Sequence, residues 1–210
     1  MKLQLKETYD HNARFRDTTK VQSWKIAEMD RFIAKLQEAG LGRRVLDLGS
    51  GPGQQAMYLQ DHGCEVHCVD LSDEMVRICK EKGLEATVMD FYSLDLEQLS
   101  FDAVWCMNAL LHVPKDSLGK VLGQVEKVIK PDGFVYMGLY GGYESEGIWE
   151  DDDYLPQRFF SFYEDDHIQH RVNEVFTISE FYSMPVEGSR LQYQAMVAWK
   201  KQNNPLKNPN

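Results

Sequence analysis

The amino-acid sequence predicts an α/β fold, a mostly parallel sheet of seven strands with helices on both faces. Between residues 43 and 140, five short apolar segments alternate with segments of helical periodicity. Such alternation builds a parallel sheet with right-handed crossovers. Two more strand patterns near the carboxyl end are joined by a short loop that contains Pro185 and Gly188. We therefore expect these two strands to pair as an antiparallel hairpin at the end of the sheet.

Each expected element has its own local signal. Apolar side chains recur at helical spacing from Val21 to Leu36, and Gly40 ends this first helix. The expected strands cover residues 43–49, 65–70, 85–90, 101–107, 133–140, 175–184 and 191–200. Further helices are expected over 54–63, over 72–83 with Ser72 as its cap, and over 118–129, where a KPDG turn follows.

One domain is expected to span residues 1–201. It divides into a helical cap over 1–40, a glycine-rich core over 41–142, an insertion over 143–173 and the hairpin over 174–201. The insertion is rich in aromatic and acidic residues, and long loops in compact domains often act as lids. The polar tail, 202–210, contains two prolines and is expected to be disordered.

Composition excludes several classes of partner. The formal net charge of -10 disfavours nucleic acid, because the protein would repel a phosphate backbone. No apolar stretch approaches the roughly 20 residues that span a bilayer, and the first residues lack a secretion signal, so we expect no membrane contact and a cytoplasmic location. The four cysteines show no paired CxxC spacing, so we expect reduced, buried thiols and no metal.

The strongest motif is VLDLGSGPG, residues 45–53, which lies at the end of the first strand. Ligands bind in open α/β sheets at such strand ends. Gly49, Gly51 and Gly53 allow a sharp turn and close approach of a ligand, and Asp47 lies just upstream as a hydrogen-bond acceptor. A dinucleotide-binding turn would be spaced GxGxxG, so a nicotinamide cofactor is disfavoured. The turn could also be no more than a tight connection between elements.

Further candidates follow the next strands. Asp70 ends the second strand, where its carboxylate could accept two hydrogen bonds from a ribose. Its alternative role as a helix cap is already filled by Ser72. Met75 could lie against an adenine or be plain core.

An acid and an aromatic residue, Asp90 and Phe91, follow the third strand and suit an adenine ring. Met107 and Asn108 end the fourth strand beside the glycine turn. Asn108 could alternatively satisfy its own backbone in a turn.

In this order, the motifs closely resemble those of the class I S-adenosylmethionine (SAM)-dependent methyltransferases, over roughly residues 40–140. The resemblance implies a Rossmann-like, seven-stranded sheet with an antiparallel last strand. It also implies that SAM is the cofactor and S-adenosylhomocysteine the product, with the methionine part on the glycine turn, the ribose on Asp70 and the adenine on Asp90. The segment YDHNARF resembles one that folds over the cofactor in small-molecule members, with Phe15 in place of its second tyrosine. The expected cofactor contacts are Tyr9, Asp47, Gly49, Ser50, Gly51, Gly53, Gln54, Asp70, Leu71, Met75, Asp90, Phe91, Met107 and Asn108.

The acceptor pocket is expected in the insertion, which is similar to one in a bacterial subgroup of this family. The candidate substrate residues are Tyr140, Trp149, Tyr154, Arg158, Phe159 and Phe160, with Arg158 holding an anionic group. Alternatively, the aromatic residues cover the sheet edge while Arg158 pairs with nearby acids. The acidic run over 144–153 could attract an amine or be solvated surface. His112 could act as a general base, or it could pack against and cap the next helix.

The sequence therefore predicts an enzyme that transfers a methyl group from SAM to a small molecule by in-line displacement. A protein that binds SAM for regulation, without catalysis, is the alternative because no catalytic base is unambiguous. A DNA amino-methyltransferase would carry an N/D-P-P-Y/F segment where this chain has Asn108-Ala109-Leu110-Leu111. No motif indicates the acceptor or an oligomeric state.

Overall fold

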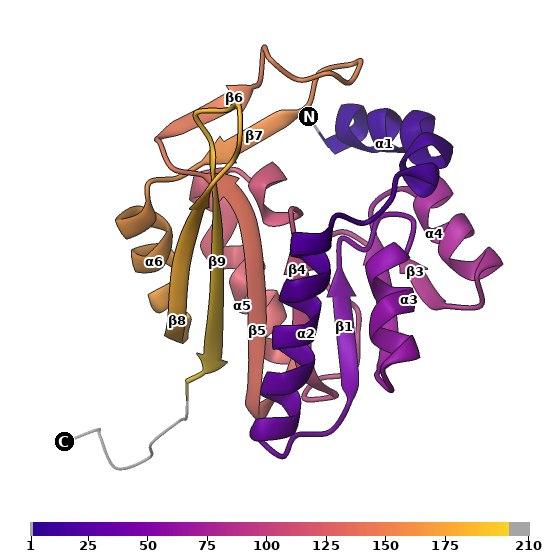
Figure 1. Ribbon diagram of the computed structural model, residues 1–210, viewed down its shortest axis with the longest axis vertical. Coiled ribbons are helices and arrows are strands. Elements are labelled where there is room, and N and C mark those ends of the chain that lie inside the picture. The colour runs from indigo at the N-terminus through magenta and orange to yellow at the C-terminus, as the bar shows by residue number, and fades with distance from the viewer. Residues whose placement is uncertain (1, 202–210) are drawn as a thin grey trace.

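The computed structural model describes residues 2–201 and has a central sheet between helical layers (Figure 1). The predicted disordered tail, 202–210, lies outside the described residues. The seven strands of the sheet are β1 Arg44–Leu48, β2 Glu65–Asp70, β3 Glu85–Val88, β4 Phe101–Met107, β5 Ile129–Gly141, β8 Phe176–Pro185 and β9 Gln192–Lys200.

The sheet order is β3-β2-β1-β4-β5-β9-β8. The first five strands pair in parallel, whereas β9 is antiparallel to both β5 and β8. The predicted hairpin and the seven-stranded sheet are thus confirmed. The chain builds outward from β1 to β3 and then returns to place β4 beside β1, which creates a switch point where ligands bind in open sheets.

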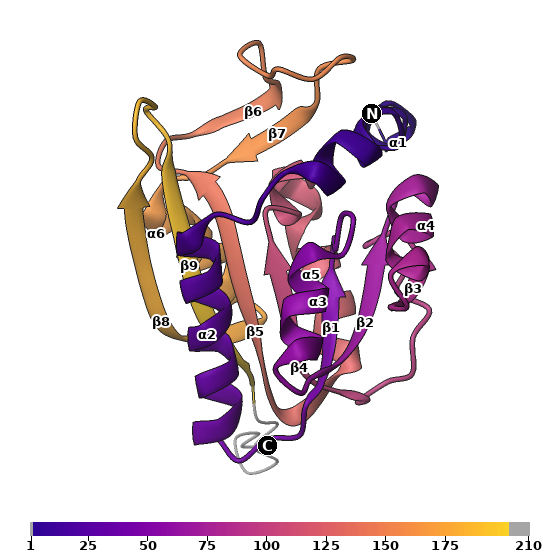
Figure 2. The ribbon, with the colours of Figure 1, turned by 45° about the vertical axis from the view of Figure 1, so that its right-hand side comes forward.

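Two apolar layers sandwich the sheet, because alternate side chains of each strand face opposite sides. On one face pack α2 (Ser23–Glu38), α3 (Gln54–Asp61) and α4 (Asp73–Glu81). The other face is covered by α5 (Leu118–Val128) and α6 (Asp165–Asn173). In β4, for example, Trp105 faces the first layer and Val104 the second. Figure 2 shows α2 on the near side of the sheet, beside β5.

Two segments cross above the carboxyl ends of the strands (Figures 1 and 2). Helix α1, Lys2–Thr18, lies over the glycine turn and packs on α4. The insertion forms a two-stranded sheet, β6 Ser145–Ile148 with β7 Phe159–Phe162, connected by residues 149–158. Together, α1 and residues 149–158 cover the switch point, and we call them the roof.

The structure differs from the sequence prediction in three places. Strand β5 begins at Ile129, so the KPDG residues belong to this strand and not to a turn before it. Strand β3 ends at Val88, which leaves Asp90 in the following loop. The strands β6 and β7 and helix α6 were not predicted, because the insertion has no regular apolar period. Among residues 2–201, no helix is both long enough and apolar enough to cross a membrane.

Candidate functional site

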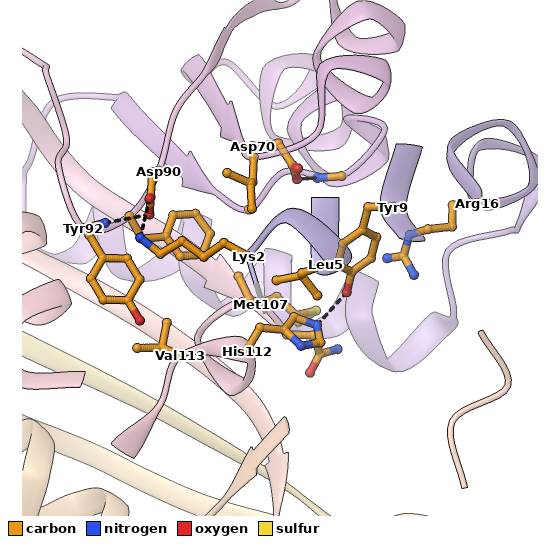
Figure 3. A pocket seen from close by; sticks show the side chains of 16 residues that line it. Lys2, Leu5, Tyr9, Arg16, Asp70, Asp90, Tyr92, Met107, His112 and Val113 are labelled. Carbon is orange, nitrogen blue, oxygen red and sulfur yellow. Dashed lines mark hydrogen bonds and ion pairs between the residues drawn. The ribbon is translucent and has the colours of Figure 1, made fainter. Parts of the chain in front are cut away.

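A cavity lies beneath α1 at the carboxyl ends of β1, β2 and β4 (Figure 3). Its empty space, including the part that is open to solvent, is about 780 Å³. Its lining consists of Lys2, Leu5, Tyr9, Arg16, Gly49, Gly51, Asp70, Leu71, Asp90, Phe91, Tyr92, Met107, Asn108, Ala109, His112 and Val113. Ten of these residues are among those singled out from the sequence.

The three glycines of the turn have different reasons to lack a side chain. A Cβ on Gly49 would lie 2.4 Å from the Ala109 Cβ, and one on Gly53 would lie 2.5 Å from Leu84 Cδ1. Gly51 has a φ of +54°, and its Cβ would meet no atom within 4 Å because it would project into open space. Since Gly51 lines the cavity, it is the glycine whose missing side chain leaves room for a ligand.

Asp70 joins the second strand to this turn. Its Oδ2 accepts a hydrogen bond from the Gly51 amide at 2.8 Å, and its Oδ1 accepts one from the Ser72 amide at 2.9 Å. Ser72 Oγ in turn caps α4 by accepting from the Met75 amide, as predicted. Burial raises the pKa of Asp70, and these amides oppose that shift. Asp70 thus fixes the glycine turn while it lines the cavity.

Two buried acceptors near the turn have no hydrogen-bond partner among the described residues. They are Asp47 Oδ2, on β1, and Asn108 Oδ1, just after β4. Burial raises the pKa of Asp47 well above its usual range. Asn108 has a φ of 56° and lines the cavity. An unsatisfied buried acceptor costs about 1–3 kcal/mol, so a ligand that donates hydrogen bonds would be stabilised here. We call Gly49, Gly51, Asp70 and Asn108 the floor.

The opposite end of the cavity is formed by residues that follow β3. Asp90 forms an ion pair with Lys2 of α1 at 2.6 Å and accepts from the Tyr92 amide. Phe91 packs close to Gly49, whose Cβ would lie 3.3 Å from the Phe91 Cζ. In Figure 3, Asp90 and Arg16 lie at opposite ends of the cavity, so a ligand that fills it would extend between them.

A second cavity of about 1,170 Å³, including its open part, adjoins the first. Both cavities are lined by Arg16, Gly49, Gly51, Met107 and Asn108. The remaining lining residues of the second are Phe15, Thr19, Lys20, Val21, Gln22, Lys25, Ser50, Pro52, Gln54, Gln55, Asp153 and Tyr154. The shared residues show that the two cavities meet at the glycine turn, so a ligand in one could meet a ligand in the other.

The roof is held by a chain of buried polar contacts. Asp152, 7% exposed, binds the Arg158 guanidinium through Nε at 3.0 Å and Nη2 at 2.6 Å. Arg158 Nη1 donates to the Tyr9 hydroxyl at 3.0 Å, and that hydroxyl lies 2.6 Å from His112 Nε2 (Figure 3). This chain connects residues 149–158 with α1 and with the loop that follows β4.

The tautomer of His112 follows from its partners. His112 Nδ1 lies 2.7 Å from the Phe159 carbonyl oxygen, which can only accept, so Nδ1 carries the proton. Nε2 therefore accepts from the Tyr9 hydroxyl. Burial, together with the charges of Arg158 and Arg16, lowers the pKa of His112 to about 3. His112 is neutral at pH 7, and its lone pair is already used, which favours the packing alternative over a general base.

Most of the candidate substrate residues line neither of these two cavities. Tyr154 lines the second. Trp149 and Phe160 pack edge to face with ring centroids 5.1 Å apart, and Tyr140 packs on Tyr193. Phe159 holds His112 through its carbonyl group, and Arg158 is neutralised by Asp152. The structure thus corresponds to the alternative in which aromatic residues cover the sheet and Arg158 pairs with an acid.

Three expected cofactor residues also line neither cavity. Gly53 packs on Leu84, Met75 is fully buried with Ala13 and Ile78, and Asp47 lies beneath the turn. Sequence reasoning missed Lys2, Leu5, Arg16 and Lys25, which α1 and α2 bring to the cavities. Their signal was weak, because no motif distinguishes the three charged residues among them from the charges of a solvated helix face.

Comparison with known proteins finds a similar domain in the middle of the chain. A family model described as a methyltransferase domain matches residues 45–133. A ubiquinone biosynthesis O-methyltransferase of Xanthomonas oryzae is 34% identical over 116 residues, 52% of this chain and 47% of the relative. Its counterpart in Bordetella avium is 27% identical over 135 residues, 61% of this chain and 54% of the relative. The chain thus spans about half the length of these curated relatives.

Solved structures share the fold over nearly the whole chain. The 1,6-didemethyltoxoflavin-N1-methyltransferase of Burkholderia thailandensis, with bound 1,6-didemethyltoxoflavin and S-adenosylhomocysteine, has a TM-score of 0.73 at 20% identity and covers 95% of this chain and 88% of its own. The [4+2]-cyclase SpnF has a TM-score of 0.74 at 17% identity and covers 97% of both chains. At such identities the likeness establishes the fold.

Proposed function

We propose that this chain, which belongs to the class I SAM-dependent methyltransferases, transfers the methyl group of SAM to a small-molecule acceptor. The observation that carries the proposal is the floor, where Gly51 leaves open space and Asn108 Oδ1 is a buried acceptor without a partner among the described residues. SAM carries an ammonium group and two ribose hydroxyls, which supply the donors that this floor lacks.

The residues present fit SAM along the length of the first cavity. The carboxylate of Asp70 would accept from the ribose, and Leu71 and Phe91 would contact the adenine beside Asp90. Asn108 Oδ1 would accept from the methionine ammonium group, since Asn108, like Arg16, lines both cavities. The other expected contacts in the two linings are Tyr9, Gly49, Ser50, Gly51, Gln54 and Met107.

Methyl transfer from SAM requires little of the protein beyond the positioning of the two reactants. When bound, SAM supplies a methyl group that its sulfonium has already activated. The second cavity, which meets the first at Gly49 and Gly51, would hold the acceptor next to the cofactor. The roof would exclude water, since Tyr9 and Leu5 lie directly over the first cavity.

No proton transfer by His112 is needed in this proposal. A histidine with a pKa of about 3 is a weak base at pH 7, and its Nε2 binds Tyr9. His112 instead positions Tyr9 and so holds α1 over the cofactor. The acceptor would then react as a nucleophile that requires little assistance, or it would lose its proton to solvent.

Two matched glycine variants test the floor. Gly51 and Gly188 both have positive φ and open space around a Cβ, but Gly188 lies in the turn between β8 and β9, away from the cavity. Both Gly51→Leu and Gly188→Leu incur the backbone strain of about 1–2 kcal/mol, whereas only Gly51→Leu fills ligand space. In isothermal titration, S-adenosylhomocysteine should bind the wild type and Gly188→Leu and lose at least about 100-fold in affinity for Gly51→Leu. Equal affinity in both variants would refute the cofactor site.

A SAM-binding protein without methyl transfer is the second candidate. The neutral His112 favours it, because Nε2 of this histidine is engaged by Tyr9 and is not free to act as a base. Incubation with SAM labelled in its methyl group and a panel of phenols, amines and thiols separates the two functions. Acceptor-dependent release of S-adenosylhomocysteine supports transfer, whereas SAM binding without turnover supports the regulatory role.

We also propose a cytoplasmic location for this activity. All four cysteines, Cys64, Cys68, Cys79 and Cys106, are buried as free thiols, which is the usual state in a reducing compartment. Fractionation of cells that produce the protein would test this location.

A further inference from the structure

We propose that the methyl acceptor is an anion, and that Lys25, with Arg16 beside it, binds its carboxylate or similar group in the second cavity. The inference rests on the proposed function, because it assigns the substrate class of the same site. The anion-binding residue is then Lys25 in the second cavity and not Arg158, which Asp152 neutralises.

The charge of the second cavity is opposite to that of the protein. Arg16, Lys20 and Lys25 line it together with one acid, Asp153. The whole chain has a formal net charge of -10. Among residues 2–201, none of these three cations has a carboxylate within ion-pair distance. Most of the other lysines and arginines in this range do have one. A cavity lined by one sign of charge concentrates ligands of the opposite sign.

Lys25 and Arg16 are both partly removed from water without an acidic partner. Burial lowers the pKa of Lys25, and the nearby charge of Arg16 lowers it further. Arg16 Nη1 donates to the Tyr154 hydroxyl at 3.3 Å, while its Nε is buried without a partner. Two adjacent, unpaired cations are costly in the free protein. An acceptor anion beside Lys25 would relieve the cost at this lysine, whereas Arg16 also lines the first cavity.

The backbone at this position also favours an anion. Lys25 lies in the first turn of α2, whose N-cap residue, Gln22, makes no capping hydrogen bond through its side chain. The first turn contains no acidic residue. The positive end of this 16-residue helix therefore adds to the charge of Lys25.

The arrangement of the two cavities separates the acceptor from the cofactor. Arg16 lines both cavities, so it lies where the carboxylate of SAM would reach, whereas Lys25 lines only the second. Phe15, Val21 and Tyr154 supply apolar surface in the second cavity. The geometry thus suits a molecule that has an apolar part and an anionic group directed at Lys25.

Matched ligand pairs test the inference on the protein loaded with S-adenosylhomocysteine. The probes are benzoate, cinnamate and indole-3-acetate, each compared with its neutral amide. We expect at least one carboxylate to bind about tenfold or more tightly than its amide, as a charge-assisted hydrogen bond provides. Lys25→Met should abolish this preference, and Lys25→Arg should retain it. Lys80→Met removes an exposed charge outside both linings and serves as the control for net charge. The absence of any preference for the carboxylates, including a lack of binding by every probe, overturns the proposal.

A second comparison distinguishes the two sources of carboxylate. The Kd of S-adenosylhomocysteine, which has the amino-acid part, is compared with that of 5′-methylthioadenosine, which lacks it. If Lys25 serves the acceptor, Lys25→Met changes both values less than about twofold. If Lys25→Met weakens the binding of S-adenosylhomocysteine but not that of 5′-methylthioadenosine, Lys25 holds the cofactor and the proposal is wrong. Should S-adenosylhomocysteine fail to bind the wild type, the proposed function itself fails, which is a different result.

Discussion

The floor and the roof of the cavity are built by different means. The floor depends on backbone geometry at strand ends: Gly51 has a positive φ and its amide is held by Asp70. The roof depends on side chains that reach across the chain: Arg158 and Tyr9 are 149 residues apart, and Tyr9 and His112 are 103 apart. The floor is therefore fixed by the sheet, while the roof exists only as long as its contacts persist.

This difference teaches how such a site could admit a ligand. Helix α1 is held from below by the Asp10 carboxylate, which accepts a hydrogen bond from Ser72 Oγ at 2.5 Å. It is joined to residues 149–158 by Thr8 Oγ1, which donates to the Pro156 carbonyl oxygen at 2.8 Å. Few apolar residues of α1 are buried. Segments with few buried apolar contacts open at lower free energy than the core. We therefore expect the roof to open while the floor stays intact.

The largest effect is expected from breaking the roof at its buried ion pair. Asp152→Ala leaves the Arg158 guanidinium, whose side chain is 13% exposed, without its carboxylate. Loss of one partner of a buried pair costs about 3–5 kcal/mol, so hydrogen exchange of residues 149–158 and α1 should accelerate strongly. Asp151→Ala removes an exposed neighbouring acid and should change exchange little. Similar exchange in the two variants would show that the pair does not hold the roof.

A smaller effect, confined to the floor, is expected from Asp70→Ala. The variant loses the acceptor of the Gly51 and Ser72 amides as well as a contact to the ligand. Hydrogen bonds to a charged group contribute about 1.5–3 kcal/mol, so the Kd of S-adenosylhomocysteine should rise about 10- to 100-fold in calorimetry. Hydrogen exchange of the roof should be unchanged, and Asp61→Ala, an exposed acid at the end of α3, is the control. An unchanged Kd would remove Asp70 from the site.

The sequence predicted the floor well because its signals are local. Each signal lies at the end of a strand that its own apolar pattern predicts. These signals are the glycine spacing after β1, the acid that ends β2 and Asn108 after β4. Local signals could not show why each of these positions requires a glycine. Gly49 and Gly53 are set by Ala109 and Leu84, which lie far along the chain.

The roof could not be predicted from local patterns. Arg158 was identified as polar and adjacent to acids, but only the fold selects Asp152 as its partner and Tyr9 as its neighbour. Helix α1 has charged residues on most of its surface, so its sequence alone does not indicate which face covers the cavity. Lys25 has the same difficulty, since its lack of an acidic partner is a property of the tertiary structure.

The pH dependence of stability provides a further way to separate the roof from the floor. His112 has a pKa of about 3 in the folded protein and about 6.5 when unfolded. Between these values the unfolded chain binds a proton that the folded chain does not, so stability is lost as pH falls below about 6.5. The site contributes a slope of up to about 1.4 kcal/mol per pH unit. Urea denaturation at several pH values should show a shallower loss in His112→Asn than in the wild type.

His170→Asn is the matched control for this measurement. The His170 side chain is 75% exposed on α6 and binds no buried group. Its variant should follow the wild-type slope, because it leaves the buried contacts of His112 unchanged. Parallel slopes for the wild type and His112→Asn would contradict the buried, neutral state of His112.

The smallest effect, and the sharpest test of the comparison, is expected from Tyr9→Phe. The ring remains, and only the hydroxyl that joins Arg158 to His112 is removed. A hydrogen bond of this kind contributes about 0.5–1.5 kcal/mol, so hydrogen exchange in α1 should accelerate while the Kd of S-adenosylhomocysteine changes by less than about threefold. Tyr58→Phe removes a hydroxyl of α3 that donates to Asp30 of α2, and it should leave α1 unchanged. A large loss of affinity in Tyr9→Phe alone would mean that the hydroxyl binds the ligand, and the roof would then be part of the binding site and not a removable cover.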